Sequence, residues 1–594
     1  MKYIHIAIFT CLACFMMACN DDFLDRTPET SISDPDFWKS ENDIRLYANN
    51  FYNKEELLPN YKAYFNMGPF GIDADDGTDT QIALEYNRRM NGELLRPEKS
   101  NDTPWEIKSW EVLRNINYFM DNYKKANVSE QNLQQYVGEA LFFRSLFYFN
   151  KLRQYGDVPF VSKVLSTNSP ELMNIRISRA ALVDSLMRDL DLANTYLPDK
   201  NEGKALGRIN KEAGLLLQAR IALYEGSWEK YHAGTNFGVD GSDGKTLLQK
   251  AAAASKQLID LNSCDLDNTH DKQWGYWRLF NQEDYASSKE IILFRKYSLS
   301  ENVTHLRSRY SSFGGARGVT KAMVDSYLCT DGKAIAANTL YMGDDKLSDL
   351  IQNRDPRLAQ TIYVNDDQHY QFTGAANIKF KYPAFELNNQ TRSVTGYDLY
   401  KGHNPDYKQY NEAQSTTATI YFRYAEALLI YAEAMGELGE ISQNDLDLSI
   451  NKLRDRVGMP HLKIANIAHD PNWDFPALSP IINEIRRERK VELACEGFRK
   501  DDIYRWAAIE ILIAGKRPLG AKKQQFLGLA DAPEGFEGAV NALQTNANGY
   551  IDPYATYNGM GSGYNFKLNR DYLLPIPLLE ITLNDKLKQN PNWE

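Results

Sequence analysis

The 594-residue chain has little clustered positive charge and, beyond its first residues, no long hydrophobic run. Lysine and arginine together number 68 against 79 aspartates and glutamates, which gives a formal net charge of −11. The most basic stretch, residues 486–490, carries a glutamate of its own. Because nucleic-acid binding needs a clustered positive surface, DNA and RNA are not expected partners. After residue 18 no apolar run approaches the roughly 18 residues of a transmembrane helix, so no membrane-spanning helix is expected there.

The cysteines are too few and too widely spaced for a disulfide framework. Of the six, three lie within the first 19 residues, and the other three lie far apart: Cys264, Cys329 and Cys495. These three cysteines form no CxxC pair and the chain has no HxxxH spacing, which argues against a zinc site that uses them. An odd number of thiols in an exported protein allows at most one disulfide, and three buried thiols are the expectation.

The start of the chain has the pattern of a bacterial lipoprotein leader. Lys2 precedes an apolar run that ends in Met16-Met17-Ala18, and Cys19 follows directly. An apolar run this short is typical of a secretory signal and not of a membrane-spanning helix. The pattern predicts a signal peptide over residues 1–18 and acylation of Cys19, the alternative being an ordinary signal peptide with an incidental cysteine. Two or more acyl chains anchor a protein stably, so a body tethered to a membrane outside the cytoplasm is expected.

Helical periodicity dominates two blocks of the chain, at about 105–261 and 420–513. In the first block an apolar face runs from Val137 to Leu152, and Gly156 follows as a stop signal. The helices form pairs of about 35 to 45 residues, the size of tetratricopeptide (TPR) hairpins, although the TPR consensus is absent. One helix, at about 211–225, carries small residues that would let a partner helix approach closely: Ala213, Gly214, Ala219 and Ala222.

Two long excursions from this helical scaffold, at about 61–104 and 262–419, are rich in Gly, Asn, Asp and aromatic residues. Loops of this length within a compact protein are commonly functional, so a ligand site is expected there. The whole chain is rich in rings, with 36 Tyr, 26 Phe and 9 Trp. Exposed rings suit flat apolar ligand faces, of which sugar rings are a common extracellular example.

An ordered set of short motifs extends over nearly the whole chain. In chain order it includes Asp22-Phe23-Leu24-Asp25, Phe37-Trp38, Gly138-Glu139-Ala140, Tyr155-Gly156-Asp157-Val158-Pro159, Gly207-Arg208-Ile209-Asn210-Lys211, Arg354-Asp355-Pro356-Arg357-Leu358, Arg423-Tyr424-Ala425-Glu426-Ala427, Glu496-Gly497 with Arg499, and Leu574-Pro575-Ile576-Pro577. This set resembles the SusD/RagB family, the nutrient-binding outer-membrane lipoproteins of Bacteroidetes. The acidic pair Asp21-Asp22 is similar to the surface-export signals of lipoproteins in these bacteria.

The resemblance implies a fold, a location and a partner. The fold would be mainly α-helical, with four TPR-like helix pairs, an irregular loop-rich face and minor β-hairpins, in a single domain over residues 19–594. The protein would be lipid-anchored in the outer membrane, exposed at the cell surface and not an enzyme. It would bind an oligosaccharide and deliver it to a TonB-dependent transporter of the SusC type. Two rivals remain: an uptake subunit for peptides or other nutrients and, with less support, a lipoprotein glycoside hydrolase.

Candidate sugar-binding residues lie in the excursions and at one helix start. Trp105 matches a position where relatives present an aromatic platform, although tryptophan is more often packed than exposed. The segment Asp73–Asp79 bunches four acids around a glycine, which fits a solvated loop, hydroxyl contacts through Asp73 and Asp75, or a calcium loop without the EF-hand spacing. The other candidates could instead pack onto the scaffold: Trp274, Trp277, Tyr310, Arg392 and Tyr397.

Acidic residues also recur along the C-terminal helices. Glu426 and Glu433 lie seven residues apart, and a second series follows at i, i+4 and i+8: Glu488, Glu492 and Glu496. Paired carboxylates would suit glycoside hydrolysis, but acids on one helix face are poorly placed to flank a sugar. A salt-bridged scaffold is the favoured interpretation, with nearby arginines as partners: Arg423, Arg486, Arg489 and Arg499. No catalytic residue and no cofactor is therefore expected, with calcium as the one open possibility.

Overall fold

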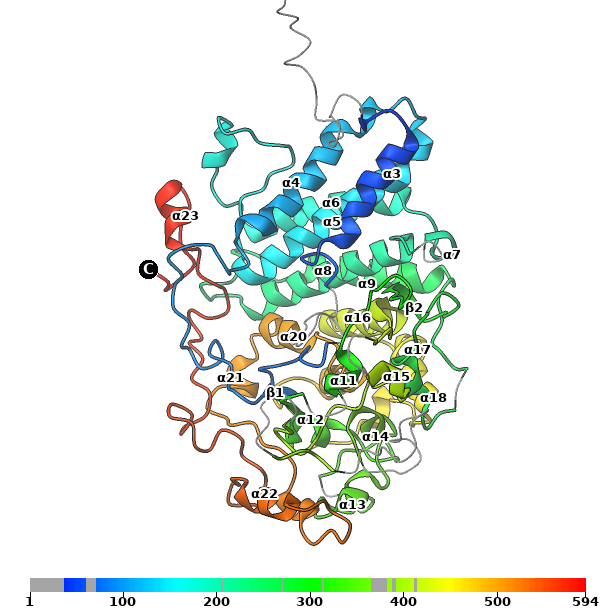
Figure 1. The fold of residues 1–594 in the computed structure, drawn as a ribbon, viewed down its shortest axis with the longest axis vertical. Coiled ribbons are helices and arrows are strands. Elements are labelled where there is room, and N and C mark those ends of the chain that lie inside the picture. The colour runs from blue at the N-terminus through cyan, green and yellow to red at the C-terminus, as the bar shows by residue number, and fades with distance from the viewer. Residues whose placement is uncertain are drawn as a thin grey trace, which may run out of the picture.

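The computed structural model describes residues 37–59, 71–203, 207–269, 271–311, 315–336, 338–364, 382–386, 392–410 and 414–594. The predicted signal peptide and Cys19 lie outside these ranges. Long helices gather in the upper half of Figure 1, and a loop-rich part with short helices lies below them. The prediction of a mainly α-helical fold with an irregular second face is confirmed.

The N-terminal helical block consists of long helices packed side by side. They are α3 (Glu41–Asn49), α4 (Ile107–Asn122), α5 (Glu130–Tyr155), α6 (Arg179–Tyr196), α8 (Lys211–Tyr231) and α9 (Lys245–Asp260). Contacts run from α4 to α5, α5 to α6, α6 to α8 and α8 to α9. The expected stop of the first long helix is confirmed, because Gly156 caps α5 with a positive φ of 68°.

The C-terminal helical block contacts the first block through two of its helices. Its members are α16 (Tyr424–Leu438), α17 (Gln443–Leu448), α18 (Ile450–Val457), α19 (Pro480–Glu492), α20 (Arg499–Arg505) and α21 (Ile509–Leu512). Helix α16 is buried over most of its length and packs against both α9 and α19, and α20 contacts α8. The hydrophobic core is therefore continuous between the two blocks.

The strands form two small antiparallel pairs. β1 (Gln81–Ala83) pairs with β3 (Arg317–Val319), and β2 (Ile291–Arg295) pairs with β4 (Thr419–Arg423). The expectation of β-hairpins is wrong for these sheets, because more than a hundred residues separate the partners of each pair. The first pair instead joins the two excursions to each other. The second ties the middle excursion to the scaffold, because β4 leads directly into α16.

The loop-rich part has a hydrophobic core of its own, built around Trp277, Tyr327 and Tyr397. Its short helices are α10 (Gly275–Leu279), α11 (Arg307–Ser311), α12 (Lys321–Ser326), α13 (Leu347–Ile351), α14 (Arg357–Thr361), α15 (Tyr407–Tyr410) and α22 (Phe536–Ala542). The chain then returns to the N-terminal block, where α23 (Leu578–Leu583) lies at its edge (Figure 1).

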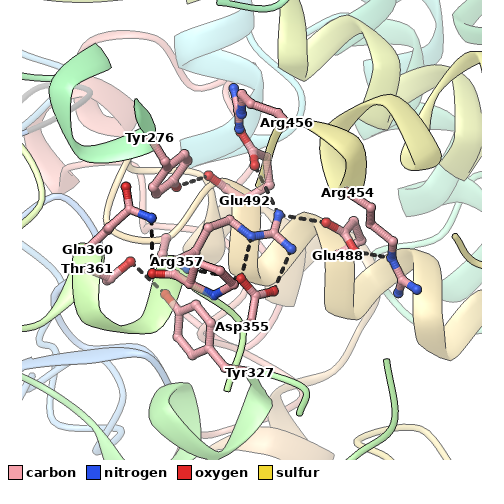
Figure 2. A network of polar contacts seen from close by, with 12 residues as sticks. Tyr276, Tyr327, Asp355, Arg357, Gln360, Thr361, Arg454, Arg456, Glu488 and Glu492 are labelled. Carbon is pink, nitrogen blue, oxygen red and sulfur yellow. Dashed lines mark hydrogen bonds and ion pairs between the residues drawn. The ribbon is translucent and has the colours of Figure 1, made fainter. Parts of the chain in front are cut away.

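A buried network of ion pairs joins α19 to the middle of the chain. In Figure 2, Arg357 donates to Asp355 (2.7 Å) and to Glu488 (2.6 Å). Glu492 accepts from Arg423 (2.8 Å) and also from Arg456. These guanidinium groups hold the pKa of Glu492 well below its usual range, against the opposing effect of burial.

The prediction of a salt-bridged scaffold is confirmed, although two of the four arginines pair with acids other than the predicted glutamates. Glu426 pairs with Arg220, and Glu433 pairs with Arg505. Arg486 instead pairs with Glu437, and Arg499 pairs with Asp79. The acids on α16 and α19 are therefore structural.

The three cysteines of the described residues are buried and free, as predicted: Cys264, Cys329 and Cys495. Burial raises the pKa of the Cys264 thiol to about 11, which keeps it protonated and unreactive. Over the described ranges, every helix is too short or too polar to span a membrane.

Candidate functional site

A cavity of about 540 Å³ lies where the two helical blocks meet the first excursion. Its walls come from the C-terminal half of α5, from α8, from α20, from residues 104–109 at the start of α4, and from loops at 56–59 and 73–74. We call it the central cavity. Its size falls within the range of roughly 300–1,000 Å³ that is typical of small-molecule sites.

Lys151 is a buried cation in the wall of the central cavity. Its Nζ donates to the carbonyl of Pro104 and to the hydroxyl of Ser109. The ammonium group also lies 5.1 Å from the ring centroid of Trp110 and 5.2 Å from that of Phe147. Burial lowers the pKa of Lys151 to about 8, so the group stays mostly protonated at neutral pH. It fixes the loop before α4 onto α5.

Arg153 and Gln154 present unused hydrogen-bonding atoms in the same wall. The guanidinium of Arg153 pairs with Asp501 and donates to Asn150 Oδ1 at 2.6 Å. Within the described part of the chain, Arg153 Nε has no acceptor and Gln154 Oε1 has no donor. Buried polar atoms normally find partners, so an unused donor on Arg153 and an unused acceptor on Gln154 suit a ligand with hydroxyl groups.

The ring of Phe498 supplies an apolar surface in the central cavity. It is half-buried and precedes α20, whereas the other rings of the wall, such as Phe149 and Tyr224, are fully packed. The guanidinium of Arg220 lies 5.2 Å from the Phe498 centroid and is held by two bonds to Glu426, of 2.6 and 2.7 Å. The cavity therefore combines a ring with cations, carboxylates and amides.

Of the predicted site residues, Asp73 lines the central cavity and Asp75 does not. Asp75 is buried and accepts the backbone N–H groups of Cys495 (2.8 Å), Gly497 (3.1 Å) and Arg499 (3.2 Å). Burial raises the pKa of Asp75 to about 7, against the effect of these bonds. The acidic segment is therefore docked on the turn between α19 and α20 and is not a solvated loop.

Trp105 is packed in this structure. Its side chain is 5% exposed, and its ring meets Trp110 and Tyr155 edge to face at 5.3 and 4.8 Å. The residues on either side, Pro104 and Glu106, both line the central cavity. The sequence therefore pointed to a segment that borders the central cavity, while the role of the Trp105 ring as a platform stays a prediction.

The five candidates of the middle excursion lie away from the central cavity. Trp277 stacks on Tyr400 with centroids 5.1 Å apart, and Trp274 meets Trp277 edge to face. Tyr397 belongs to the same core, Tyr310 packs with Ile72 and Leu306, and Arg392 is half-buried. Their part in sugar binding stays a prediction, and these placements favour packing for the four aromatic residues.

The sequence interpretation missed most of the cavity wall, including Lys151, Arg153, Phe498 and Asp501. The available signal for Lys151 and Arg153 was two cations that follow the apolar stretch 146–149 near the end of α5. Phe498 lies inside the motif formed by Glu496-Gly497 and Arg499, and this position indicated a structural residue of the scaffold. Among the described residues, no group of three or more His, Cys, Asp and Glu side chains is arranged to hold a metal ion.

Two family models match the chain in separate parts. One, described as the SusD family, matches residues 267–593, and another, described as starch-binding associating with outer membrane, matches residues 22–223. A SusD-like protein of Formosa agariphila is 22% identical over 591 residues, covering 98% of each chain. A second SusD-like protein of that organism is 23% identical over 525 residues, covering 86% of this chain and 93% of its own.

Solved structures show the same fold. A SusD-like carbohydrate binding protein from Bacteroides fragilis aligns with a TM-score of 0.70 and 22% identity, over 93% of this chain and 100% of its own. A laminarin binding SusD-like protein aligns with a TM-score of 0.53 and 17% identity, over 93% of this chain and 100% of its own. The matched motifs, the helical scaffold and a family model that covers more than half of the chain agree: this chain belongs to the SusD family.

Proposed function

We propose that this protein is a cell-surface lipoprotein that binds an oligosaccharide in its central cavity and delivers it to a SusC-like TonB-dependent transporter. The central cavity carries the proposal, because it gathers Asp73, Lys151, Arg153 and Phe498 around a space of about 540 Å³. The printed description of one family model as starch-binding supports a sugar ligand, as does the carbohydrate-binding title of the Bacteroides fragilis structure.

The chemistry of the cavity wall suits hydroxyl groups, each of which can both donate and accept. Arg153 Nε would donate to one ligand oxygen, and Gln154 Oε1 would accept from another. Asp73 would accept further hydroxyl protons, and the Phe498 ring would contact the apolar face of a sugar. No bond is made or broken in this scheme. The affinity is modest, because desolvating hydroxyls offsets much of the gain from binding them.

The outer-membrane location is supported by the leader pattern and by the second family model, which matches from residue 22. Cys19 would carry the lipid, and the transporter would receive the ligand from the protein. Labelling cells with radioactive palmitate tests the anchor: wild type is expected to incorporate label, and Cys19→Ala is expected to incorporate none. Label that persists in Cys19→Ala would overturn the anchor assignment.

Glycan binding is tested by native affinity electrophoresis of the unlipidated body, Asn20 to Glu594, through gels that contain different polysaccharides. Retardation by one glycan class is expected, and Asp73→Ala and Arg153→Ala are each expected to weaken it at least fivefold. Arg278→Ala is the matched control, because that cation pairs with Asp271 outside the cavity. Thermal unfolding checks that each variant is folded.

Three results would count against the proposal. Retardation that both cavity variants retain would place the glycan elsewhere on the protein. Binding of peptides with no retardation by any glycan would favour the peptide-uptake alternative. Release of shorter sugars during incubation with a retained polysaccharide, detected by chromatography, would favour a hydrolase.

A further inference from the structure

A second cavity, of about 280 Å³, lies on the other side of α19. We call it the side cavity. Its walls come from α12, from residues 334–335, from the loop at 470–475 and from α19, and it shares no lining residue with the central cavity. The neighbouring residues Arg489 and Lys490 line the central and the side cavity respectively, so α19 is the wall between them.

The indole of Trp473 is a fixed aromatic surface in the side cavity. It is half-buried, and its Nε1 donates to Glu484 Oε1 at 3.1 Å. His469 meets the ring edge to face, with centroids 5.0 Å apart at 88°. These two contacts hold the plane of the ring before any ligand arrives, which lowers the entropic cost of stacking a sugar on it.

Polar groups of suitable type surround this ring. The Asp474 carboxylate is 42% exposed and lies 3.3 Å from Lys490 Nζ, which also lies 3.1 Å from Asp79. Asn472 is exposed in the same loop, and Ser326 contributes a hydroxyl from α12. A carboxylate held by a buried ammonium group while part of it faces solvent is placed to accept hydrogen bonds from hydroxyls.

The charges of the side cavity are already balanced. Lys490 lies between Asp79 and Asp474, Arg499 is bound to Asp79 by two bonds, and Arg487 pairs with Asp470. A sulfate or carboxylate ligand would therefore find no unpaired cation among the described residues of this wall. The balance favours a neutral ligand over an anionic one.

We propose that the side cavity is a second saccharide site, which binds one neutral pyranose ring on the face of Trp473, with Asp474 and Asn472 bonded to its hydroxyls. Its volume suits a single ring better than a chain, because it lies just below the range typical of drug-sized ligands. The inference rests on the proposed function in that both assign saccharide ligands to this protein. Two sites on opposite sides of α19 would let one protein hold a long glycan at two points and raise the effective concentration at each.

The test uses the unlipidated body, Asn20 to Glu594, labelled with 5-fluorotryptophan and observed by fluorine NMR. The Trp473 signal is assigned as the one missing from Trp473→Phe. The probes are D-glucose, D-galactose, D-mannose, maltose, laminaribiose and cellobiose, each titrated to 50 mM, with D-glucuronic acid as the anionic comparison. A saturable shift of the Trp473 signal is expected with at least one neutral sugar, and a smaller shift with the acid.

Variants separate this site from the central cavity. Asp474→Ala is expected to weaken the Trp473 response at least fivefold, whereas Arg153→Ala and the exposed control Asp260→Ala leave it unchanged. Unaltered signals from the other tryptophans show that each variant is folded. A Trp473 signal that no sugar moves, or one that moves equally in Asp474→Ala, overturns the second site. That result leaves the central cavity standing if polysaccharide retardation persists and is weakened by Asp73→Ala or Arg153→Ala. A Trp473 response together with polysaccharide retardation that neither of these variants weakens would overturn the central site instead.

Discussion

Burial separates side chains that the sequence presents as equivalent. Asp73 and Asp75 are two residues apart in one acidic segment, yet Asp73 lines the central cavity and Asp75 is an anchor beneath it. The three N–H groups that Asp75 accepts come from the turn between α19 and α20, about 420 residues later in the chain. A carboxylate with three donors is a structural acceptor and leaves little capacity for a sugar.

His305 shows the same effect on a titratable ring. Its Nδ1 accepts from the Arg307 N–H (3.1 Å) and its Nε2 lies 2.8 Å from the Thr417 carbonyl, so one neutral tautomer satisfies both contacts. Burial lowers the pKa of His305 to about 3, below its unfolded value near 6.5. In acid the unfolded chain therefore binds a proton that the folded protein does not, and this contribution to stability falls as the pH falls from about 6.5 toward 3.

We predict that the stability advantage of wild type over His305→Gln shrinks by about 2 kcal/mol between pH 7 and pH 5, because only wild type can protonate this position when unfolded. Urea unfolding of both proteins at the two pH values measures this difference in the free energy of unfolding. The comparison cancels other groups, such as His232 and Asp75, that titrate equally in both proteins. An advantage that is the same at pH 7 and pH 5 would contradict the assignment of a neutral, buried ring.

At the scale of elements, α19 organises the C-terminal block through its charges. Its glutamates bind arginines from three other segments: Arg357 on α14, Arg423 at the end of β4, and Arg456 on α18. The same helix separates the central cavity from the side cavity. A helix with this many buried charges depends on its partners, because an unpaired buried charge is costly.

We predict that Glu492→Gln lowers the free energy of unfolding by about 3–5 kcal/mol, since it leaves Arg423 and Arg456 short of a buried counter-charge. The matched control is Asp260→Asn on α9, whose pair with Lys256 is solvent-exposed and is worth less than about 1 kcal/mol. Denaturant unfolding measures both variants. A loss for Glu492→Gln no larger than that of the control would show that the network contributes little to stability.

At the scale of the whole molecule, the C-terminal segment closes the structure over the N-terminal block. The Leu574 N–H donates to the Gln154 carbonyl (2.7 Å), next to the central cavity, and Asn590 donates to the Tyr155 carbonyl (3.0 Å). Trp593 is buried and lies under the guanidinium of Arg570, 4.0 Å from the ring centroid. The last residues therefore help to position the end of α5, which carries Lys151 and Arg153.

We predict that a chain ending at Asn569 unfolds at least 10 °C below wild type and loses glycan retardation. The removed residues include the buried Trp593 and support the end of α5. Differential scanning calorimetry and affinity electrophoresis measure the two effects. Leu583→Ser is the control: that side chain is 66% exposed on α23, so its replacement is expected to change stability by less than about 0.5 kcal/mol. A truncated chain that unfolds at the wild-type temperature would show that the C-terminal segment does not contribute to the stability of the fold.

Much of the scaffold could be predicted because helix formation leaves a local signal. The stop at Gly156 was expected on this basis. In the structure Ser178 caps α6 in the same local way, since its side chain accepts from the Ala181 N–H. The small residue Gly214 is explained by one partner, since a Cβ there would meet Asn194 Oδ1 at 2.1 Å on α6. The helical periodicity of the second block does not mark every break: the chain over 443–457 is divided into α17 and α18 at Ser449.

By itself, the sequence determined the helical scaffold, the three buried thiols, the structural role of the α16 and α19 acids, and the family resemblance. These features depend on periodicity, spacing and charge within short stretches. Only the tertiary structure decided which side chains face a cavity. Asp73, Arg153 and Asp501 come from parts of the chain that are far apart in sequence, and no local pattern records that they meet. The same packing buried Trp105 and Trp277, because a ring that looks available for a ligand also packs well against its neighbours.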